Sequence, residues 1–337
     1  MITFRHTRSK LFLAAPLALA LTVSACGSDS NTDASDEPAE SLTGSIFITG
    51  SSTVEPISVA VGEAFGDKFT LVPDVEGPGT GDGFKKFCAG EADIANASRP
   101  IKDEEIAACE SEKVEFQELK VGLDALTVMT SQANDSINCL TTEDLYGLVG
   151  PESEDVKSWS DAADHGATSK LPDAPLEISA PGTESGTYDA FWELAIKSIA
   201  EEKLGKDAAK EQPLRPDYGG LADDNEIVDA IASSESGFGW VGFAFAEQAD
   251  GIKEIEIDGG DGCVAPSADT VGDGTYPLSR ALYIYVNTAK LKESPALQKF
   301  VDFYLSDEGI AAVTDSGYIA LDDAELTATR DAWKAVQ

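Results

Sequence analysis

Residues 45–56 read SIFITGSSTVEP, and this stretch changes character at its centre. SIFIT is a short apolar run of the kind that forms a buried strand. GSST is a turn of glycine and hydroxyl residues, and the pattern after it places Ile57, Val61 and Phe65 on one helical face. A strand, a glycine-containing loop and a helix in this order predict an α/β protein.

The same alternation continues through the 337 residues. Further strands are expected where short apolar or alternating runs occur, at 68–73, 92–95, 124–131, 176–179 and 280–287. Helical patterns lie between them and again near 295–305 and 307–314. The alternation predicts α/β architecture with mainly parallel sheets.

The length suffices for two domains. The chain is expected to leave the first unit near 121–128 and to return to it near 275–285. This predicts lobe I from residues 44–124 and 278–337, and lobe II from residues 125–277. The two crossings would form a hinge.

The N-terminus has the pattern of an export signal. Arg5, Arg8 and Lys10 precede an apolar run at 11–23, which is too short to span a bilayer. The following LTVSAC resembles the lipobox of bacterial lipoproteins, so residues 1–25 are expected to be a signal peptide and Cys26 the lipid attachment site. Residues 26–43 would then be a flexible tether, and the protein would be extracytoplasmic and anchored to the cell membrane. The alternative is an ordinary cleavable signal with an incidental cysteine.

The charge balance limits the partners. The chain has 24 Lys and Arg against 61 Asp and Glu, a formal net charge of −37. A surface of this sign repels nucleic acid, so no nucleic-acid partner is expected.

Four cysteines remain after Cys26, and they are expected to form two disulfides in an exported chain. The sequence alone allows three pairings. Cys88–Cys109 and Cys139–Cys263 are favoured because each pair then lies within one predicted lobe, whereas a link between lobes would lock the hinge. No pair has the close spacing of a zinc site, and no metal is expected.

Three loops share one chemistry: GSST (50–53), GTGDG (79–83) and ESGT (184–187). Each follows a strand or a turn and opens a helix, where unpaired backbone N–H groups and the helix dipole favour an anion. Glycine permits close approach, and Ser or Thr adds a donor. Taken singly, each loop is more simply explained as a structural helix cap. Three loops with the same glycine and hydroxyl pattern together favour an anion site.

Arg99, in NASRPI (96–101), is the most distinctive candidate. A guanidinium fork suits a tetrahedral oxyanion better than an ammonium does. The alternative is a surface ion pair with one of the many acids. Lys85 and Lys86 are expected to face solvent.

In this order and spacing, GSSTVEP, GTGDGFKKFCAGEADIANASRPI and PGTESGTYDAF resemble the phosphate-binding lipoproteins of the Pst high-affinity phosphate uptake system. The similarity extends from about residue 44 to the C-terminus and includes CLTTEDL and PLSRALYIYV. The resemblance implies a type II periplasmic-binding-protein fold: two α/β lobes joined by a double-crossover hinge, with phosphate in the cleft. It also implies delivery to the membrane permease of an ABC transporter.

Carried over motif by motif, the resemblance implies nine phosphate-binding residues. They are Ser52, Thr53, Thr80, Gly81, Ser98, Arg99, Ser185, Gly186 and Thr187. Familiar members of the wider family have an arginine shortly before SGT and an aspartate where Arg99 stands, so the arginine's role is expected to have moved to Arg99. Glu184 and Asp82 are the candidate acceptors for the proton of hydrogen phosphate.

Two other classes of function compete with this interpretation. An exported hydrolase is disfavoured because His165 is the only histidine after the predicted signal peptide and GTESG is not a nucleophile elbow. A binding protein for a sulfate-like oxyanion, or a phosphate sensor, stays open. The expectation is a monomeric binding protein that is not an enzyme and has no cofactor.

Overall fold

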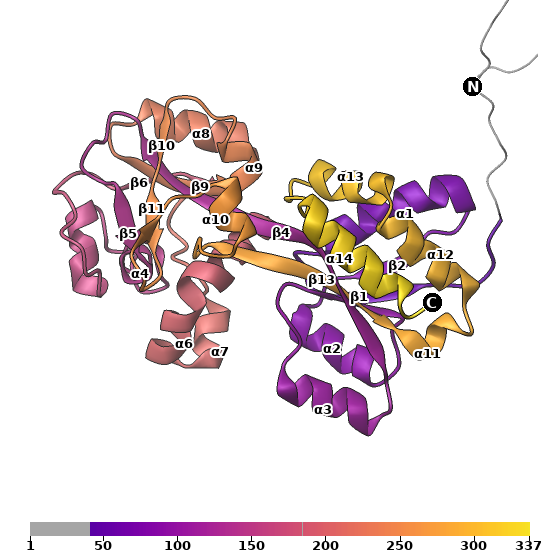
Figure 1. Cartoon of the computed structure of the whole chain (residues 1–337). Coiled ribbons are helices and arrows are strands. Elements are labelled where there is room, and N and C mark those ends of the chain that lie inside the picture. The colour runs from indigo at the N-terminus through magenta and orange to yellow at the C-terminus, as the bar shows by residue number, and fades with distance from the viewer. Residues whose placement is uncertain (1–40, 184) are drawn as a thin grey trace, which may run out of the picture. The chain divides into compact units, whose positions relative to one another are not determined.

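The computed structural model describes residues 41–183 and 185–337 (Figure 1). The chain divides into units of residues 1–38 and 39–337, and everything below concerns the second. The predicted signal peptide, Cys26, most of the tether and Glu184 lie outside the described residues. Within the described residues, no helix combines the length and the apolar character needed to cross a membrane.

One mixed sheet of eight strands forms the framework. Its order is β2 (Asp74–Glu76), β1 (Phe47–Gly50), β3 (Ile94–Ala97), β13 (Ser279–Asn287), β4 (Phe116–Ser131), β9 (Gly237–Gly242) and β6 (Glu177–Ile178), with β10 (Ile252–Glu254) also paired to β4. Two smaller sheets comprise β12 (Cys263–Val264), β11 (Glu256–Asp258) and β5 (Cys139–Thr141), and β7 (Ala180–Pro181) with β8 (Gly220–Leu221).

The expectation of mainly parallel sheets is wrong for the centre of this framework. β1 is parallel to β2 and β3, but β13 is antiparallel to both β3 and β4. β4 is also antiparallel to β9 and β10. The difference arises because β13 belongs to the returning segment, which enters the sheet in the opposite direction.

β4 is long enough to pair with two different sets of strands. Its residues 116–125 pair with β13, and its residues 126–130 pair with β9 (Figure 1). The apolar clusters divide near the same point: Leu119 and Val121 belong to one core, whereas Leu126 and Val128 belong to another. The predicted boundary between the lobes at 124/125 therefore falls inside β4.

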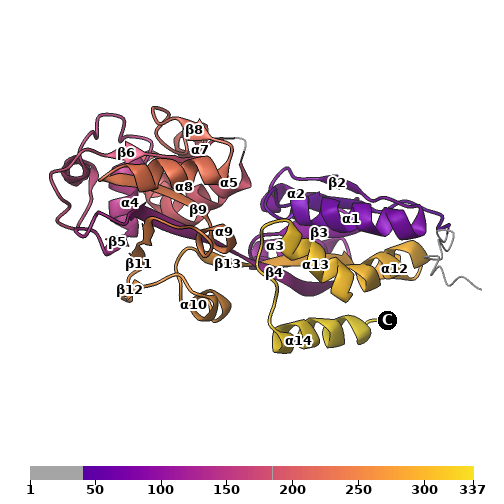
Figure 2. The same ribbon diagram turned by 90° about the horizontal axis from the view of Figure 1, so that it is seen from above.

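Helices cover both faces of the β2-β1-β3-β13 part of the sheet. Ile94 contributes to the core beneath α1 (Glu55–Phe69), α12 (Pro295–Tyr304) and α13 (Asp307–Asp315), and α14 (Asp323–Lys334) adds Trp333. The next residue, Ala95, contributes to the opposite core with α2 (Thr80–Cys88) and α3 (Asp103–Ser111), as the two-residue period of a strand requires. Figure 2 shows α1 beside α13. A short α11 (Thr288–Leu291) follows β13.

Most of the remaining helices surround the second large core, in which Trp159, Phe238 and Trp240 are fully buried, whereas the buried residues of α8 belong to a smaller core with Met129 and Val241. They are α4 (Thr142–Val149), a 3-10 helix (Trp159–His165), α5 (Gly186–Phe191), a π-helix (Trp192–Ile196), α6 (Lys197–Leu204), α7 (Lys206–Glu211), α8 (Asp224–Ser233), α9 (Phe243–Ala246) and α10 (Ala268–Gly272).

The strand expected at 68–73 is not formed. α1 extends to Phe69, and the second strand is Asp74–Glu76. Phe69 lies on the helix because its ring packs against Phe65, with centroids 4.6 Å apart, and against Phe303 at 6.3 Å. Aromatic packing therefore overrides the strand-like alternation of KFTLVP.

The structure contains both favoured disulfides. Cys88 and Cys109 link α2 to α3, and Cys139 and Cys263 link β5 to β12. Each disulfide joins two elements of the same core region. Neither disulfide links the two regions that β4 connects, so neither restricts their movement relative to each other.

Candidate functional site

The loop after β1 is built around Gly50 and Ser51. Gly50 has φ +141°, and a Cβ at this position would lie 2.1 Å from the carbonyl oxygen of Asn96, so only glycine fits. Ser51 N donates to that carbonyl at 2.9 Å, and Ser51 Oγ accepts from Thr53 N at 3.2 Å. Ser51 therefore stabilises the turn itself, whereas the hydroxyl of Thr53 accepts a hydrogen bond from outside the turn. The predicted Ser52 lies in the same turn and is half-buried.

Four of the predicted residues come together from two loops. Thr80, the first residue of α2, has its Oγ1 3.1 Å from Ser98 Oγ, and Ser98 N donates to the same Oγ1 at 3.2 Å. A Cβ at Gly81 would lie 3.9 Å from Arg99 Nη2. The start of α2 and the end of β3 thus place hydroxyls, backbone and a guanidinium side by side.

Arg99 is held by an acid within the same region. Its Nη1 and Nη2 donate to the two oxygens of Glu105 at 2.8 and 2.7 Å, and these hydrogen bonds raise the pKa of Arg99. Glu105 also accepts from Lys102 N at 3.0 Å at the start of α3. The ion pair that the sequence left open as an alternative is therefore present, with the Arg99 side chain still 31% exposed.

A second arginine, Arg280, was not among the predicted ligands. Its side chain is only 10% exposed, Nε donates to Asp124 Oδ2 at 3.0 Å, and Nη2 donates to Thr53 Oγ1 at 2.9 Å. Arg280 and Asp124 are directly opposite each other in the ladder between β13 and β4. Burial raises the pKa of Asp124, while the neighbouring Arg280 charge opposes the increase. The site thus contains a buried cation fixed by strand register.

The third partner of Arg280 comes from the π-helix between α5 and α6. Glu193 accepts a hydrogen bond from Arg280 Nη1, and its side chain is 37% exposed. Lys197 lies 3.8 Å from the same carboxylate. A single π-helical segment inside a helix is a feature that recurs at functional sites. Here it places Glu193 against Nη1, the guanidinium nitrogen for which no bond to Asp124 or Thr53 is seen.

These groups open onto a cavity of about 700 Å³. Thr80, Gly81, Ser98, Arg99 and Arg280 line it, together with Glu193 and several lysines. A separate cavity of about 420 Å³ is lined by Gly186, Thr187, Asp124 and Tyr318. The Arg280–Asp124 pair therefore lies between the two cavities.

Two of the predicted residues of the third loop line a different cavity from those of the second loop and Arg99. Ser185 is the N-cap of α5, and its Oγ accepts from Thr187 N at 3.1 Å. Gly186 and Thr187 line the smaller cavity, whereas Thr80 and Arg99 line the larger one. In this structure the loop serves first as a helix cap, which was the alternative interpretation of its sequence.

Charged residues beside the second loop are more exposed. Asp82 pairs with Lys85 at 2.7 Å, and their side chains are 54% and 80% exposed. The hydrogen bond from Lys85 lowers the pKa of Asp82, which makes Asp82 a poor proton acceptor. Lys86 was expected to face solvent, but it pairs with Glu76 and its side chain is only 40% exposed.

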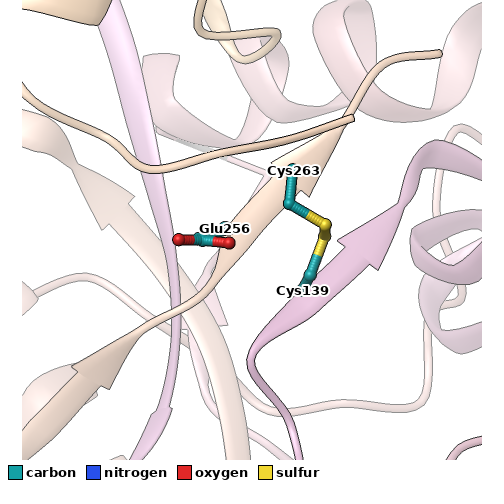
Figure 3. Close-up of side chains that lie close together, drawn as sticks. All are labelled: Cys139, Glu256 and Cys263. Atoms are coloured by element: carbon teal, nitrogen blue, oxygen red, sulfur yellow. A yellow bond between two sulfur atoms is a disulfide. The ribbon is translucent and has the colours of Figure 1, made fainter. Parts of the chain in front are cut away.

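One group of three possible metal ligands occurs among the described residues: Cys139, Glu256 and Cys263 (Figure 3). The two sulfur atoms are bonded to each other at 2.00 Å. They are not thiolates, so the group cannot bind a metal as this chemistry requires.

Comparison with known proteins places this geometry in a family. The chain matches the model of a PBP superfamily domain over residues 35–308. It is 39% identical to protein SphX of Synechocystis over 281 residues, which cover 82% of this chain and 78% of that protein. It is 34% identical to the phosphate-binding protein PstS of Staphylococcus saprophyticus over 321 residues, covering 94% and 92%.

Comparison with solved structures supports the same family and fold. A crystal structure of "a possible phosphate binding protein" from Planctomyces limnophilus has a TM-score of 0.78 and 36% identity, and covers 88% of this chain and 99% of that one. The structure of PstS from Borrelia burgdorferi has a TM-score of 0.59 at 21% identity, which supports the fold alone. The chain therefore belongs to the PBP superfamily and has the two-lobed α/β fold of the type II periplasmic binding proteins.

Proposed function

We propose that the protein captures inorganic phosphate and delivers it to the permease of an ABC transporter. The observation that carries the proposal is the buried Arg280 fork, which contacts the hydroxyl of Thr53 and opens onto the cavity of Thr80, Ser98 and Arg99. Relatives at 34% identity are named phosphate-binding proteins, in agreement with this chemistry.

The proposed ligand set is the predicted one with one addition. It comprises Ser52, Thr53, Thr80, Gly81, Ser98, Arg99, Ser185, Gly186, Thr187 and Arg280. Gly186 and Thr187 would have to approach the ligand from the second cavity, next to Asp124. Closure of the two lobes on the anion would bring the third loop to it.

The interactions are sufficient for tight binding. A micromolar dissociation constant corresponds to about −8 kcal/mol, and each charge-assisted hydrogen bond contributes about 1.5–3 kcal/mol. The summed contribution of several such bonds, from arginines, hydroxyls and backbone N–H groups, exceeds 8 kcal/mol before the entropy lost on binding is subtracted. The net charge of −37 does not prevent this, because charges farther than about 8–10 Å are screened by salt.

Among the carboxylates that the structure describes, Asp124 is better placed than Asp82 to accept the proton of hydrogen phosphate. It is buried beside Arg280 and lines the cavity that Gly186 and Thr187 share, whereas Asp82 is exposed and paired with Lys85. Sulfate has no such proton at neutral pH, so an ionised Asp124 would face a second bare anion and disfavour it.

Calorimetric titration with phosphate and sulfate in one buffer tests the proposal. Phosphate should bind with micromolar or tighter affinity, and sulfate at least about 100-fold more weakly. Equal affinities, or sulfate preferred, would refute the assignment of the ligand. Asp124→Asn should reduce the preference, since an amide no longer needs the ligand's proton.

The role of Arg280 has its own test. Arg280→Lys keeps the positive charge but removes the fork, and phosphate binding should weaken by about 2–5 kcal/mol. Arg330→Lys is the matched control. Arg330 lies on α14, donates to Leu305 O and to Asp307, and lines neither cavity. Unchanged phosphate binding by the Arg280 variant would remove Arg280 from the site.

We propose further that Cys26 carries a lipid, that residues 26–43 tether the folded part to the outer face of the cell membrane, and that the protein acts as a monomer without catalysis. The lipobox-like LTVSAC and the acidic, hydroxyl-rich segment after it support the anchor. Cys26→Ser should release the protein or leave an uncleaved precursor. Continued incorporation of labelled fatty acid in this variant would disprove the anchor.

A further inference from the structure

The larger cavity is rich in positive charge although the chain is strongly acidic. Seven cationic and four anionic side chains line it, in a chain of formal net charge −37. Besides the two arginines, the cationic residues are Lys85, Lys102, Lys197, Lys206 and Lys210. They come from separate elements, α2, the start of α3, α6 and α7, so no single helix accounts for the cluster.

Two of these five lysines have an acidic partner within 4 Å. Lys85 pairs with Asp82, and Lys197 lies near Glu193. Lys102, Lys206 and Lys210 form no ion pair within 4 Å in the part of the chain that the structure describes, although acids outnumber bases by more than two to one. All three residues are exposed, and their side chains line the cavity, where they can contact a bound anion.

The spacing on α7 supports this interpretation. Lys206 and Lys210 are four residues apart, so they share one helical face, where like charges destabilise the helix. Lys210 also lowers the pKa of Asp82, although α2 lies far from α7 in the sequence. Residues of α7 and α2 therefore line the same cavity.

The cavity is larger than one orthophosphate. Its volume of about 700 Å³ corresponds to more than twenty waters at about 30 Å³ each, whereas orthophosphate has five non-hydrogen atoms. An anion at Arg280 and the hydroxyls of Thr80 and Ser98 leaves most of the lysine-lined space unfilled.

We propose that this cavity accepts a condensed phosphate, with one phosphoryl group at the arginine and hydroxyl end and a second among Lys102, Lys206 and Lys210. The proposal rests on the proposed phosphate site. Pyrophosphate is the simplest ligand of this class. The lysines supply the positive charge that a second phosphoryl group requires.

The test compares pyrophosphate with orthophosphate by calorimetry of the full-length protein, without divalent cations. The parent should bind both anions. Lys206→Gln with Lys210→Gln should weaken pyrophosphate binding about tenfold and change orthophosphate binding less than about twofold. Lys170→Gln with Lys292→Gln removes the same charge at exposed positions outside the cavity and should alter neither.

Each other outcome has a defined meaning. Failure of the parent to bind pyrophosphate while it binds orthophosphate overturns this inference and leaves the proposed function intact. Binding of pyrophosphate without orthophosphate overturns the proposed function and retains the lysine site. The second subsite is refuted if the α7 variant loses the same affinity for both anions. It is also refuted if the control variant loses as much pyrophosphate affinity as the α7 variant, because the lysines then act only through overall charge.

Discussion

Replacing Glu193 with Gln should tighten phosphate binding. The Glu193 carboxylate accepts from Arg280 Nη1, so it occupies the position at which an incoming anion would meet the guanidinium. Binding must therefore displace Glu193 or add a second negative charge beside it. Glutamine has nearly the same shape but no charge, and it removes this competition while it preserves the packing of the π-helix.

The size of the effect follows from exposure and neighbours. Two unit charges 4 Å apart interact by about 4 kcal/mol at an effective dielectric constant of 20. Glu193 is 37% exposed and Lys197 lies 3.8 Å away, so solvent and the lysine screen much of this energy. We expect a net gain of about 1.4 kcal/mol, which is about tenfold in affinity.

Calorimetry with phosphate on the parent and Glu193→Gln would measure the change. Glu201→Gln is the control: Glu201 lines the same cavity but forms no ion pair within 4 Å among the described residues, so its replacement should change affinity far less. The gain should shrink as salt is added, because the removed repulsion is electrostatic. Unchanged or weaker binding by Glu193→Gln would refute the competition and would indicate that Glu193 accepts a hydrogen bond from the ligand.

Three further predictions concern the loops and the stability of the fold. Ser185→Ala should weaken phosphate binding by about 1–3 kcal/mol, measured by calorimetry, because one hydroxyl donor is lost while neighbouring backbone N–H groups stay. Asp217→Asn should lower the free energy of unfolding at pH 7 by about 1.5–3 kcal/mol, because Arg215, 4% exposed, loses its charged partner. Hydrogen bonds from Arg215 depress the pKa of Asp217, so the parent has this stability above about pH 4 and loses it as the pH falls toward the lowered pKa. Urea unfolding should therefore show that the difference in unfolding free energy between parent and variant becomes smaller in acid. Cys88→Ser with Cys109→Ser should cost about 3 kcal/mol of unfolding free energy for a sequence separation of 21, and a loss below 1 kcal/mol would contradict the loop-closure argument.

The sequence predicts the local parts of the site well. Glycine and hydroxyl residues between a strand and a helix indicate loops that open a helix, and Thr80 and Ser98 do lie together. Gly50 illustrates why the pattern is reliable: its backbone conformation and its approach to β3 both exclude a side chain. Such requirements depend on a few consecutive residues, so they are visible in one chain.

The charge pairs could not be predicted in the same way. Asp124 and Arg280 are 156 residues apart and meet only through the register of β4 against β13, which no local pattern reveals. The assignment of the arginine role to Arg99 alone overlooked Glu105 in the acid-rich start of α3, although an acid at the third helical position is a recognisable capping signal. The disulfide pairing could be predicted because it required only an approximate division of the chain into lobes.

The shared ladder of β4 and β13 also has a mechanical consequence. Arg280 and Asp124 are fixed to each other by backbone hydrogen bonds on both sides, so twisting of the two strands between the lobes leaves their separation nearly constant. Thr53 and Glu193 are attached to the apolar cores at the two ends of β4, and their distances to the guanidinium change with any such twist. Arg280 is thus held in place by the strands, and a rotation of one lobe against the other would make or break its bonds to Glu193 and Thr53. The energy of those bonds would in turn oppose or favour the rotation.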